Sequence, residues 1–218
     1  MYVVDSQKSW SELASSSLLL KAVSSWRKDP ESWLEGSFER LPETVRVNPL
    51  RTDSKWVEEW ISEQGGKPVP WFMGPGTAWE MPFSRGLAAG KTREMLIALH
   101  ETGRITRQEI VSMIPVLALQ VSAGDYVLDM CASPGSKTTQ ISECLGEDGV
   151  VFANEISNSR ANTLVSNVHR HGSKSAVVIN HDGRHLPNMP NHGFDKVLVD
   201  APCTGSATTR TVSYTHLR

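Results

Sequence analysis

The chain has 218 residues, of which 39% are hydrophobic and 21% charged, and its formal net charge is −2 at pH 7. This composition is typical of a folded globular protein with one substantial core, or a small domain beside part of a larger one. Neither a run of 18 apolar residues nor a secretory leader is seen, because Asp5, Lys8 and Glu12 interrupt the first twenty residues. We therefore expect a cytoplasmic protein, or a nuclear one in a eukaryote, with no membrane partner.

The cysteines and histidines argue against a disulfide framework and against a metal site. Cys131, Cys144 and Cys203 are odd in number and widely spaced, so we expect reduced thiols. Five histidines lie close together in the sequence, at positions 169, 171, 181, 185 and 192. Without paired cysteines or an HExxH pattern we assign these histidines surface or capping roles and predict no metal.

The first third of the chain differs from the rest, because all seven tryptophans precede residue 80. We divide the chain into a helical segment over residues 1–40, a small α+β domain over 41–105 and a larger domain over 106–206. In the first segment, the apolar spacing from Trp10 to Trp26 and the turn at Pro30 predict two short helices.

The small domain shows the pattern of a βαβ unit. Residues 44–48 alternate as a strand does, and Asp53 can cap a helix over residues 54–64. After two glycines, residues 69–71 predict a returning strand.

Two features of this part could contact nucleic acid. Trp56 and Trp60 lie one helical turn apart and either pack into the core, which we favour, or stack on bases. The segment 84–110 also carries a basic excess that either tracks phosphates or forms a solvated helix face. Its charged residues are Arg85, Lys91, Arg93, Arg104 and Arg107 against Glu94, Glu101 and Glu109.

A capping box at residues 106–109 predicts the start of a helix, since a Thr at N-cap and a Glu at N3 satisfy each other's backbone N–H groups. We expect this helix to carry Ile110, Met113 and Ile114 inward and to be disturbed at Pro115.

The central stretch, residues 124–145, reads as strand, tight turn and helix. Residues 126–129 are a short apolar run, as expected for a strand buried on both faces, and residues 137–145 suit a helix. Pro134 fixes φ and Gly135 removes the Cβ that would keep a ligand from the backbone. The turn aims unpaired N–H groups and the positive end of a helix dipole at a ligand above the strand.

The pattern then alternates regularly between strands and helices. Strands are predicted at residues 150–153, 176–180 and 196–199, with a helix from Ser157 or Asn158 to His171. Such alternation predicts an α/β fold with a parallel, Rossmann-like sheet. Each of the four strands finishes in an acidic residue, and these carboxylates should meet at one sheet edge: Asp129, Glu155, Asp182 and Asp200.

The acidic edge narrows the choice of cofactor. Glu155 is placed to accept the hydroxyls of a ribose. The GxGxxG fingerprint is absent and the Walker A spacing fails, which disfavours phosphate ligands. S-adenosylmethionine, with a ribose, an adenine amino group and a positive sulfonium, suits carboxylates. An NAD-type oxidoreductase is the alternative.

Five ordered segments resemble the motifs of the Sun family of RNA cytosine-C5 methyltransferases, from about residue 40 to 206. They are Arg107 to Pro115, Asp129 to Gln140, Asn154-Glu155, His181 to Gly183 and Asp200 to Gly205. The resemblance implies a Rossmann-like methyltransferase domain, preceded by a small domain that helps to hold a structured RNA. tRNA is favoured over rRNA, because residues 107–115 look closest to the tRNA-modifying members.

The resemblance also assigns roles to individual residues. It implies that Glu155 binds the ribose, that Asp182 lies near the adenine and that Asp200 lies between methyl donor and target base. The turn that would hold S-adenosylmethionine comprises Cys131, Ala132, Ser133, Pro134, Gly135, Ser136 and Lys137. We expect Cys131 to be a small packed residue of this turn, and Lys137 to attract the cofactor carboxylate or the RNA backbone.

Methylation of cytosine C5 in this family starts with addition of a thiolate to C6, which makes C5 nucleophilic. By resemblance, Cys203 assists product release, while the attacking cysteine belongs to a later Thr-Cys motif with no counterpart here. Residues 207–218 fit none of the family pattern and are expected to be a non-native tail. We therefore expect a truncated, poorly stable fragment that is inactive alone; a non-catalytic RNA-binding fragment remains a further alternative.

Overall fold

The computed structural model describes residues 18–36, 40–186 and 192–202. The chain divides into two compact units, one of residues 1–41 with 204–218 and the other of residues 42–203. The described part of the first unit contains α2 (Leu18–Ser24) and α3 (Pro30–Gly36), in agreement with the prediction of two short helices; residues 10–17 of the first predicted helix lie outside the described residues. Between them, Trp26 and Trp33 meet edge to face at 5.6 Å, and the guanidinium of Arg27 lies over both rings.

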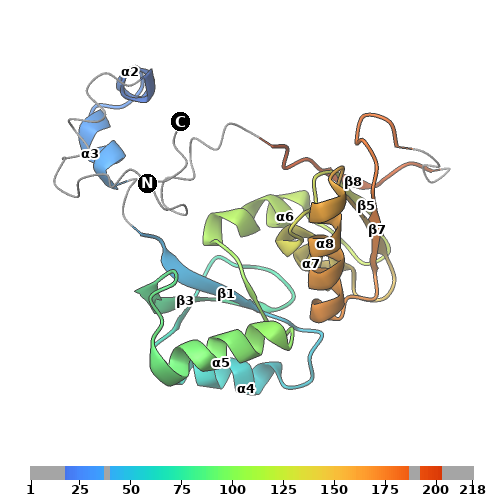
Figure 1. Cartoon of the computed structure of the whole chain (residues 1–218), viewed down its shortest axis with the longest axis horizontal. Helices are drawn as coiled ribbons and strands as arrows, with labels where there is room; N and C mark the ends of the chain where they lie inside the picture. Colours follow the sequence, from blue (N-terminus) through green and yellow to red (C-terminus); the bar gives the residue numbers. More distant parts are fainter. Residues whose placement is uncertain (1–17, 37–39, 187–191, 203–218) are drawn as a thin grey trace. The chain divides into compact units, whose positions relative to one another are not determined.

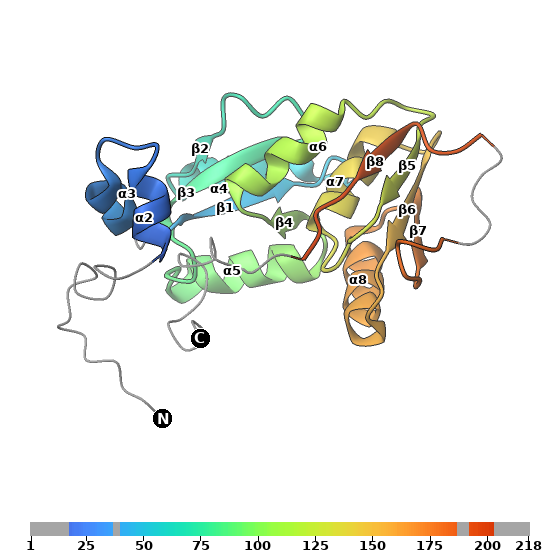
Figure 2. The same cartoon turned by 90° about the horizontal axis from the view of Figure 1, so that it is seen from above.

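The second unit begins with an antiparallel sheet whose strand order is β2-β3-β1-β4 (Figures 1 and 2). Its strands are β1 (Pro42–Val47), β2 (Lys67–Pro68), β3 (Thr77–Ser84) and β4 (Ile105–Arg107). Two helices, α4 (Ser54–Glu63) and α5 (Gly90–Glu101), pack against this sheet through one apolar core.

The predicted βαβ unit is wrong. β1 pairs antiparallel with β3 and β4, and β2 pairs only with β3 among the described strands. Trp71, placed by prediction in a strand, lies in a turn and is 42% exposed. The strand missed by prediction, β3, contains Pro82, which is typical of turns and of strand irregularities.

Other local predictions around this sheet are corrected or refined. Asp53 precedes α4 but makes no side-chain cap bond; its carboxylate instead accepts from Arg104 Nε at 2.7 Å. Trp60 packs against the apolar core, which confirms our interpretation for this residue, whereas Trp56 is 47% exposed.

The predicted capping box at residues 106–109 does not start a helix. Residues 105–107 form β4 instead, because they complete the sheet beside β1. A 3₁₀ turn, η1 (Ile110–Met113), and then α6 (Ile114–Leu119) follow. Pro115 lies in the first turn of α6, where a helix leaves its N–H groups unpaired, so it does not disturb the helix. Met113 is buried as expected, but Ile114 is 46% exposed.

The rest of the unit confirms the predicted α/β fold. Four parallel strands run in the order β7-β6-β5-β8 (Figure 2). They are β5 (Tyr126–Asp129), β6 (Val150–Asn154), β7 (Ala176–Ile179) and β8 (Lys196–Leu198). The intervening helices are α7 (Ser136–Leu145) and α8 (Asn158–His171), both close to the predicted bounds.

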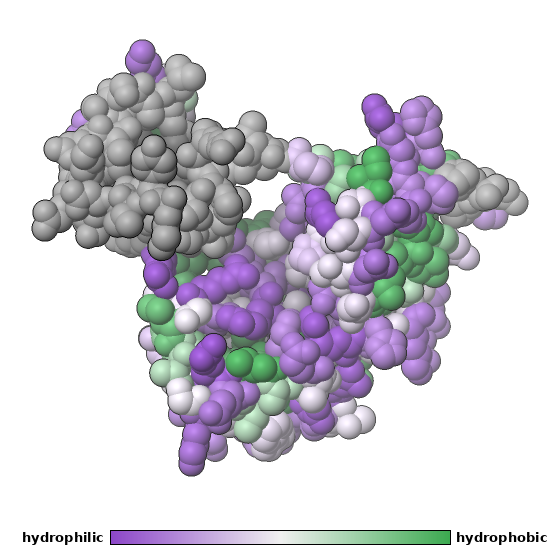
Figure 3. All heavy atoms as spheres, viewed as in Figure 1, coloured by the Kyte–Doolittle hydropathy of each residue, from purple (hydrophilic) through white to green (hydrophobic). Residues whose placement is uncertain are grey.

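Helices cover one face of the parallel sheet, and apolar side chains on the other face are exposed. α6 and α7 form a core with β5, β6 and β8, and α8 packs on Ala153 through Leu164 and Val168. Alternate residues of the strands are exposed, among them Tyr126 at 47%, Val177 at 45% and Val197 at 44%. Figure 3 shows hydrophobic surface over this part of the molecule.

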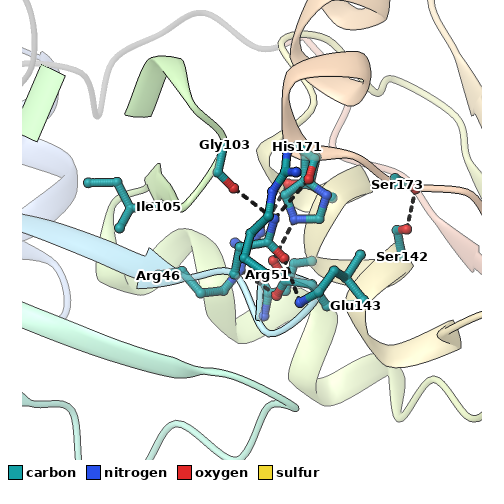
Figure 4. Close-up of polar contacts among 12 residues, drawn as sticks. Arg46, Arg51, Gly103, Ile105, Ser142, Glu143, His171 and Ser173 are labelled. Carbon is teal, nitrogen blue, oxygen red and sulfur yellow. Dashed lines mark hydrogen bonds and ion pairs between the residues drawn. The ribbon is translucent and has the colours of Figure 1, made fainter. Parts of the chain in front are cut away.

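A buried ion pair joins the two sheets. β1 alternates, so that Val45 and Val47 face α4 and α5 while Arg46 reaches the opposite side, toward α7. Arg46 Nε donates to Glu143 Oε2 at 2.7 Å, and both side chains are 0% exposed (Figure 4). Glu143 Oε1 lies 2.8 Å from Nε2 of His171, at the end of α8.

Further hydrogen bonds satisfy this pair. Arg46 donates to Thr139 Oγ1 at 2.9 Å, to the carbonyl of Ser136 at 3.3 Å and to the side chain of Gln108. Asn48 Nδ2 donates to the carbonyls of Gly103 and His171, each at 2.8 Å. A buried charge pair is tolerated when its remaining donors and acceptors are paired in this way. His171, predicted to lie at the surface or cap a helix, has a buried side chain in this network.

Replacement of Arg46 by Met should strongly destabilise the second unit. The change leaves Glu143 buried without its counter-charge, which typically costs about 3–5 kcal/mol of unfolding free energy. The double variant R46M/E143L should recover most of that loss, and K174M, at an exposed ion pair, should leave the urea midpoint unchanged. An R46M midpoint equal to that of K174M would show that the ion pair does not hold the sheets together.

Candidate functional site

The turn between β5 and α7 has a backbone that requires glycine. Gly135 adopts φ +108°, and a Cβ added there would lie 2.8 Å from Leu164 Cδ1. The preceding Ser133–Pro134 peptide bond is cis. α7 starts directly after this glycine, so its first N–H groups and the positive end of its dipole face the turn.

Hydrogen bonds fix the turn against β6 and α8. Ala132 N donates to the Asn154 carbonyl at 2.8 Å, and Ser133 Oγ donates to the Arg160 carbonyl at 2.9 Å. Arg160 in return donates from Nη2 to the Ser133 carbonyl at 2.8 Å. These hydrogen bonds to β6 and α8 therefore hold the turn in place.

Asn154, to which prediction gave no role of its own, joins the ends of three strands. Its Nδ2 donates to the carbonyls of Met130 and His181 at 3.1 and 3.0 Å, and its Oδ1 accepts from His181 N at 3.0 Å. The residue is 1% exposed. A polar residue at the last position of a buried strand was the sequence signal that could have indicated this role.

Asp129 and Glu155 are the buried members of the acidic edge. Asp129 is 1% exposed and accepts from Thr138 Oγ1 at 2.7 Å. Burial raises the pKa of Asp129 to about 6, although Thr138 and Lys137 act in the opposite direction. Glu155 is 4% exposed; its Oε1 accepts from Ser157 N at 3.0 Å and its Oε2 lies 3.4 Å from Arg160 Nη2.

Asp182 and Asp200 are more exposed and each has a cationic partner. Asp182 pairs with Arg184 at 2.6 Å, and this hydrogen bond holds the pKa of the carboxyl far below its usual range. Asp200 accepts from Lys137 Nζ at 2.7 Å. Lys137 is therefore engaged with the acidic edge rather than free in solvent.

Three of the four carboxylates act electrostatically on Cys131. Burial raises the pKa of this thiol first, and Asp129, Glu155 and Asp200 raise it further. A thiol so placed is a poor nucleophile at neutral pH, which supports a packing role. Asp182 lies at the same sheet edge, because β7 is parallel to β6, but it does not act on Cys131 in this way.

Other predicted residues are placed as follows. Cys144 is half-buried, and burial raises its pKa to about 11. Cys203 lies outside the described residues. Ile156, which prediction overlooked, follows Glu155 and is 64% exposed, an unusual exposure for so apolar a side chain.

The described residues contain no cluster of three or more His, Cys, Asp or Glu side chains that could hold a metal ion. The same part of the chain contains no helix with the length and apolar character needed to cross a membrane.

Comparisons with known proteins agree with this geometry. The profile of the 16S rRNA methyltransferase RsmB/F family matches residues 116–215. The multisite-specific tRNA:(cytosine-C(5))-methyltransferase of Saccharomyces cerevisiae is 32% identical over 253 residues, covering 94% of this chain and 36% of that protein. The ribosomal RNA small subunit methyltransferase F of Vibrio campbellii is 37% identical over 184 residues, covering 83% of this chain and 37% of that protein.

A solved structure gives the same picture. The crystal structure of a methyltransferase homologue from Pyrococcus horikoshii is 29% identical, with a TM-score of 0.67, and the match covers 86% of this chain and 59% of that one. The parallel sheet, the Pro-Gly turn and the acidic strand ends thus define a Rossmann-like methyltransferase. The chain belongs to the Sun family of RNA cytosine-C5 methyltransferases, as the sequence motifs predicted. It spans little more than a third of the two curated relatives.

The raised pKa of Asp129 predicts a distinct pH dependence of stability. Its ordinary value is 3.8 and its folded value about 6, so the unfolded chain releases this proton first as pH rises. Asp129 therefore lowers stability by up to about 3 kcal/mol between pH 4 and pH 7. Urea unfolding at several pH values should show the wild type losing that amount relative to D129N. Parallel stability curves for the two proteins would contradict the assignment.

Proposed function

We propose that the acidic edge and the turn over residues 131–137 bind S-adenosylmethionine, and that the whole protein transfers its methyl group to cytosine C5 in RNA. The bound cofactor would supply an electrophilic methyl group. The observation that carries the proposal is a glycine turn at the start of α7, together with the buried carboxylates of Asp129 at the end of β5 and Glu155 directly after β6, within a Sun-family sheet. The activity is proposed for the whole protein, because this chain matches only 36% of the length of its tRNA-modifying relative.

The residues present fit such a cofactor. Glu155 is held by Ser157 N and Arg160 with its carboxylate at the end of β6, where a ribose would be bound. The exposed Ile156 beside it offers an apolar surface to the adenine ring. Asp182 would accept from the adenine amino group, at the expense of its present pair with Arg184.

Asp200 and Lys137 would act at the other end of the cofactor. Lys137 is 16% exposed and already bonded to Asp200, so the pair offers a cation for the cofactor carboxylate and an anion near the sulfonium. By family resemblance, Asp200 then lies between the methyl donor and the target base, and Cys203 assists product release. The target cytosine must be flipped out of its helix to reach such a site.

We infer that tRNA is the substrate. The alignment with the tRNA-modifying relative extends over 94% of this chain, against 83% for the rRNA methyltransferase. The α+β segment over residues 41–105 would position the RNA. Methyl transfer by the whole protein should be faster on tRNA transcripts than on rRNA fragments; the reverse order would assign an rRNA substrate.

Titration calorimetry on the 218-residue chain tests the cofactor. S-adenosylmethionine should bind, and NADH should give no heat. Glu155→Gln should weaken S-adenosylmethionine binding by about 10- to 100-fold, because charge-assisted hydrogen bonds to the ribose are lost. Glu94→Gln, which removes an exposed carboxylate on α5, is the matched control and should bind as the wild type does. Tight NADH binding would move the assignment to an oxidoreductase.

A further inference from the structure

A cavity of about 320 Å³ lies beside the cofactor turn but away from the acidic strand ends. The antiparallel sheet and the C-terminal end of α5 border it on one side. The first turn of α7 and the last turn of α8 border it on the other. Pro134, Gly135 and Ser136 line it, so the cavity and the proposed cofactor site adjoin the same turn. None of the four carboxylates of the acidic edge belongs to its lining.

The lining of this cavity is basic. Arg85, Arg107, Arg170 and His100 contribute to it, and none of the described residues that line it is acidic. Arg107 is already paired with Glu43. Arg85 and Arg170 make no ion pair with any part of the chain that the structure describes.

The surroundings show the effect of these uncompensated charges. Burial and then Arg170 lower the pKa of His100, against the opposing effects of its hydrogen bond to Ile105 and of Glu101, while Arg107 lowers it to a smaller extent. Arg85 contributes to lowering the pKa of Glu43. The start of α7 adds the positive end of a ten-residue helix. Hydrophilic residues predominate over this region of the surface (Figure 3).

We propose that the cavity binds a backbone phosphate of the RNA substrate, held between Arg85 and Arg170. Its volume accommodates a phosphate with part of the adjoining ribose, and guanidinium groups bind phosphate oxygens through paired N–H donors. The inference rests on the proposed function, since it assigns the RNA a contact next to the cofactor turn. A phosphate held here would fix the RNA relative to residues 134–136 without reading its sequence.

Fluorescence anisotropy with a labelled tRNA transcript tests the inference on the full 218-residue chain. The double variant R85Q/R170Q should weaken binding about tenfold at 0.1 M KCl, and the slope of log K against log salt should fall by about 1.5–2. The control K91Q/R93Q removes two exposed charges from α5 that do not line the cavity, and should change affinity less than threefold. Equal melting temperatures would show that all variants are folded.

The other outcomes overturn the inference, and they separate it from the proposed function. Equal losses in R85Q/R170Q and K91Q/R93Q would mean that only overall charge matters, leaving the methyltransferase assignment intact. Stabilisation of the wild type by inorganic phosphate, abolished in R85Q/R170Q without any change in tRNA affinity, would make the cavity a free-anion site. Absence of tRNA binding by a wild type that binds S-adenosylmethionine would overturn both the RNA substrate and this cavity's role.

Discussion

The contact on which the rest of the second unit depends is the ion pair between Arg46 and Glu143. Both side chains are fully buried, so their charges have lost the stabilisation that water gives, and their hydrogen bonds to each other and to neighbouring groups make their burial tolerable. Arg46 also bonds to Thr139 and to the carbonyl of Ser136, in the first turn of α7. The antiparallel sheet thereby sets the position of the helix whose start forms the proposed cofactor turn.

Groups of opposite charge lie near that turn. The acidic residues stand at or follow the ends of the parallel strands, whereas the turn also borders a basic cavity whose lining contains none of the four carboxylates. On our proposals, the acidic side receives a cationic cofactor and the basic side a polyanionic substrate. Because residues 134–136 line the cavity and belong to the proposed cofactor turn, these proposals bring the two ligands to one short segment that glycine geometry and hydrogen bonds to α8 already fix.

The parallel sheet could be predicted from the sequence, because buried parallel strands are short apolar runs with clear turn signals after each. The antiparallel sheet could not. β3 contains Pro82, and residues 106–109 satisfy the capping-box pattern although β1 recruits residues 105–107 as a strand. Arg46 alternates with valines as a solvent-facing residue would, and its partner Glu143 is 97 positions away. No local sequence pattern predicts such a pair. The basic cavity could not be predicted for the same reason, because its lining residues come from positions 85 to 171.

Hydrogen–deuterium exchange of the 218-residue chain, with and without S-adenosylmethionine, tests the central claim most directly. The account predicts slower exchange at residues 130–138 and 155–157 when the cofactor is present, with no change in α4, which lies on the far face of the antiparallel sheet. Unchanged exchange at the turn between β5 and α7, or protection confined to the basic cavity, would contradict the assignment of the acidic strand ends as the cofactor site.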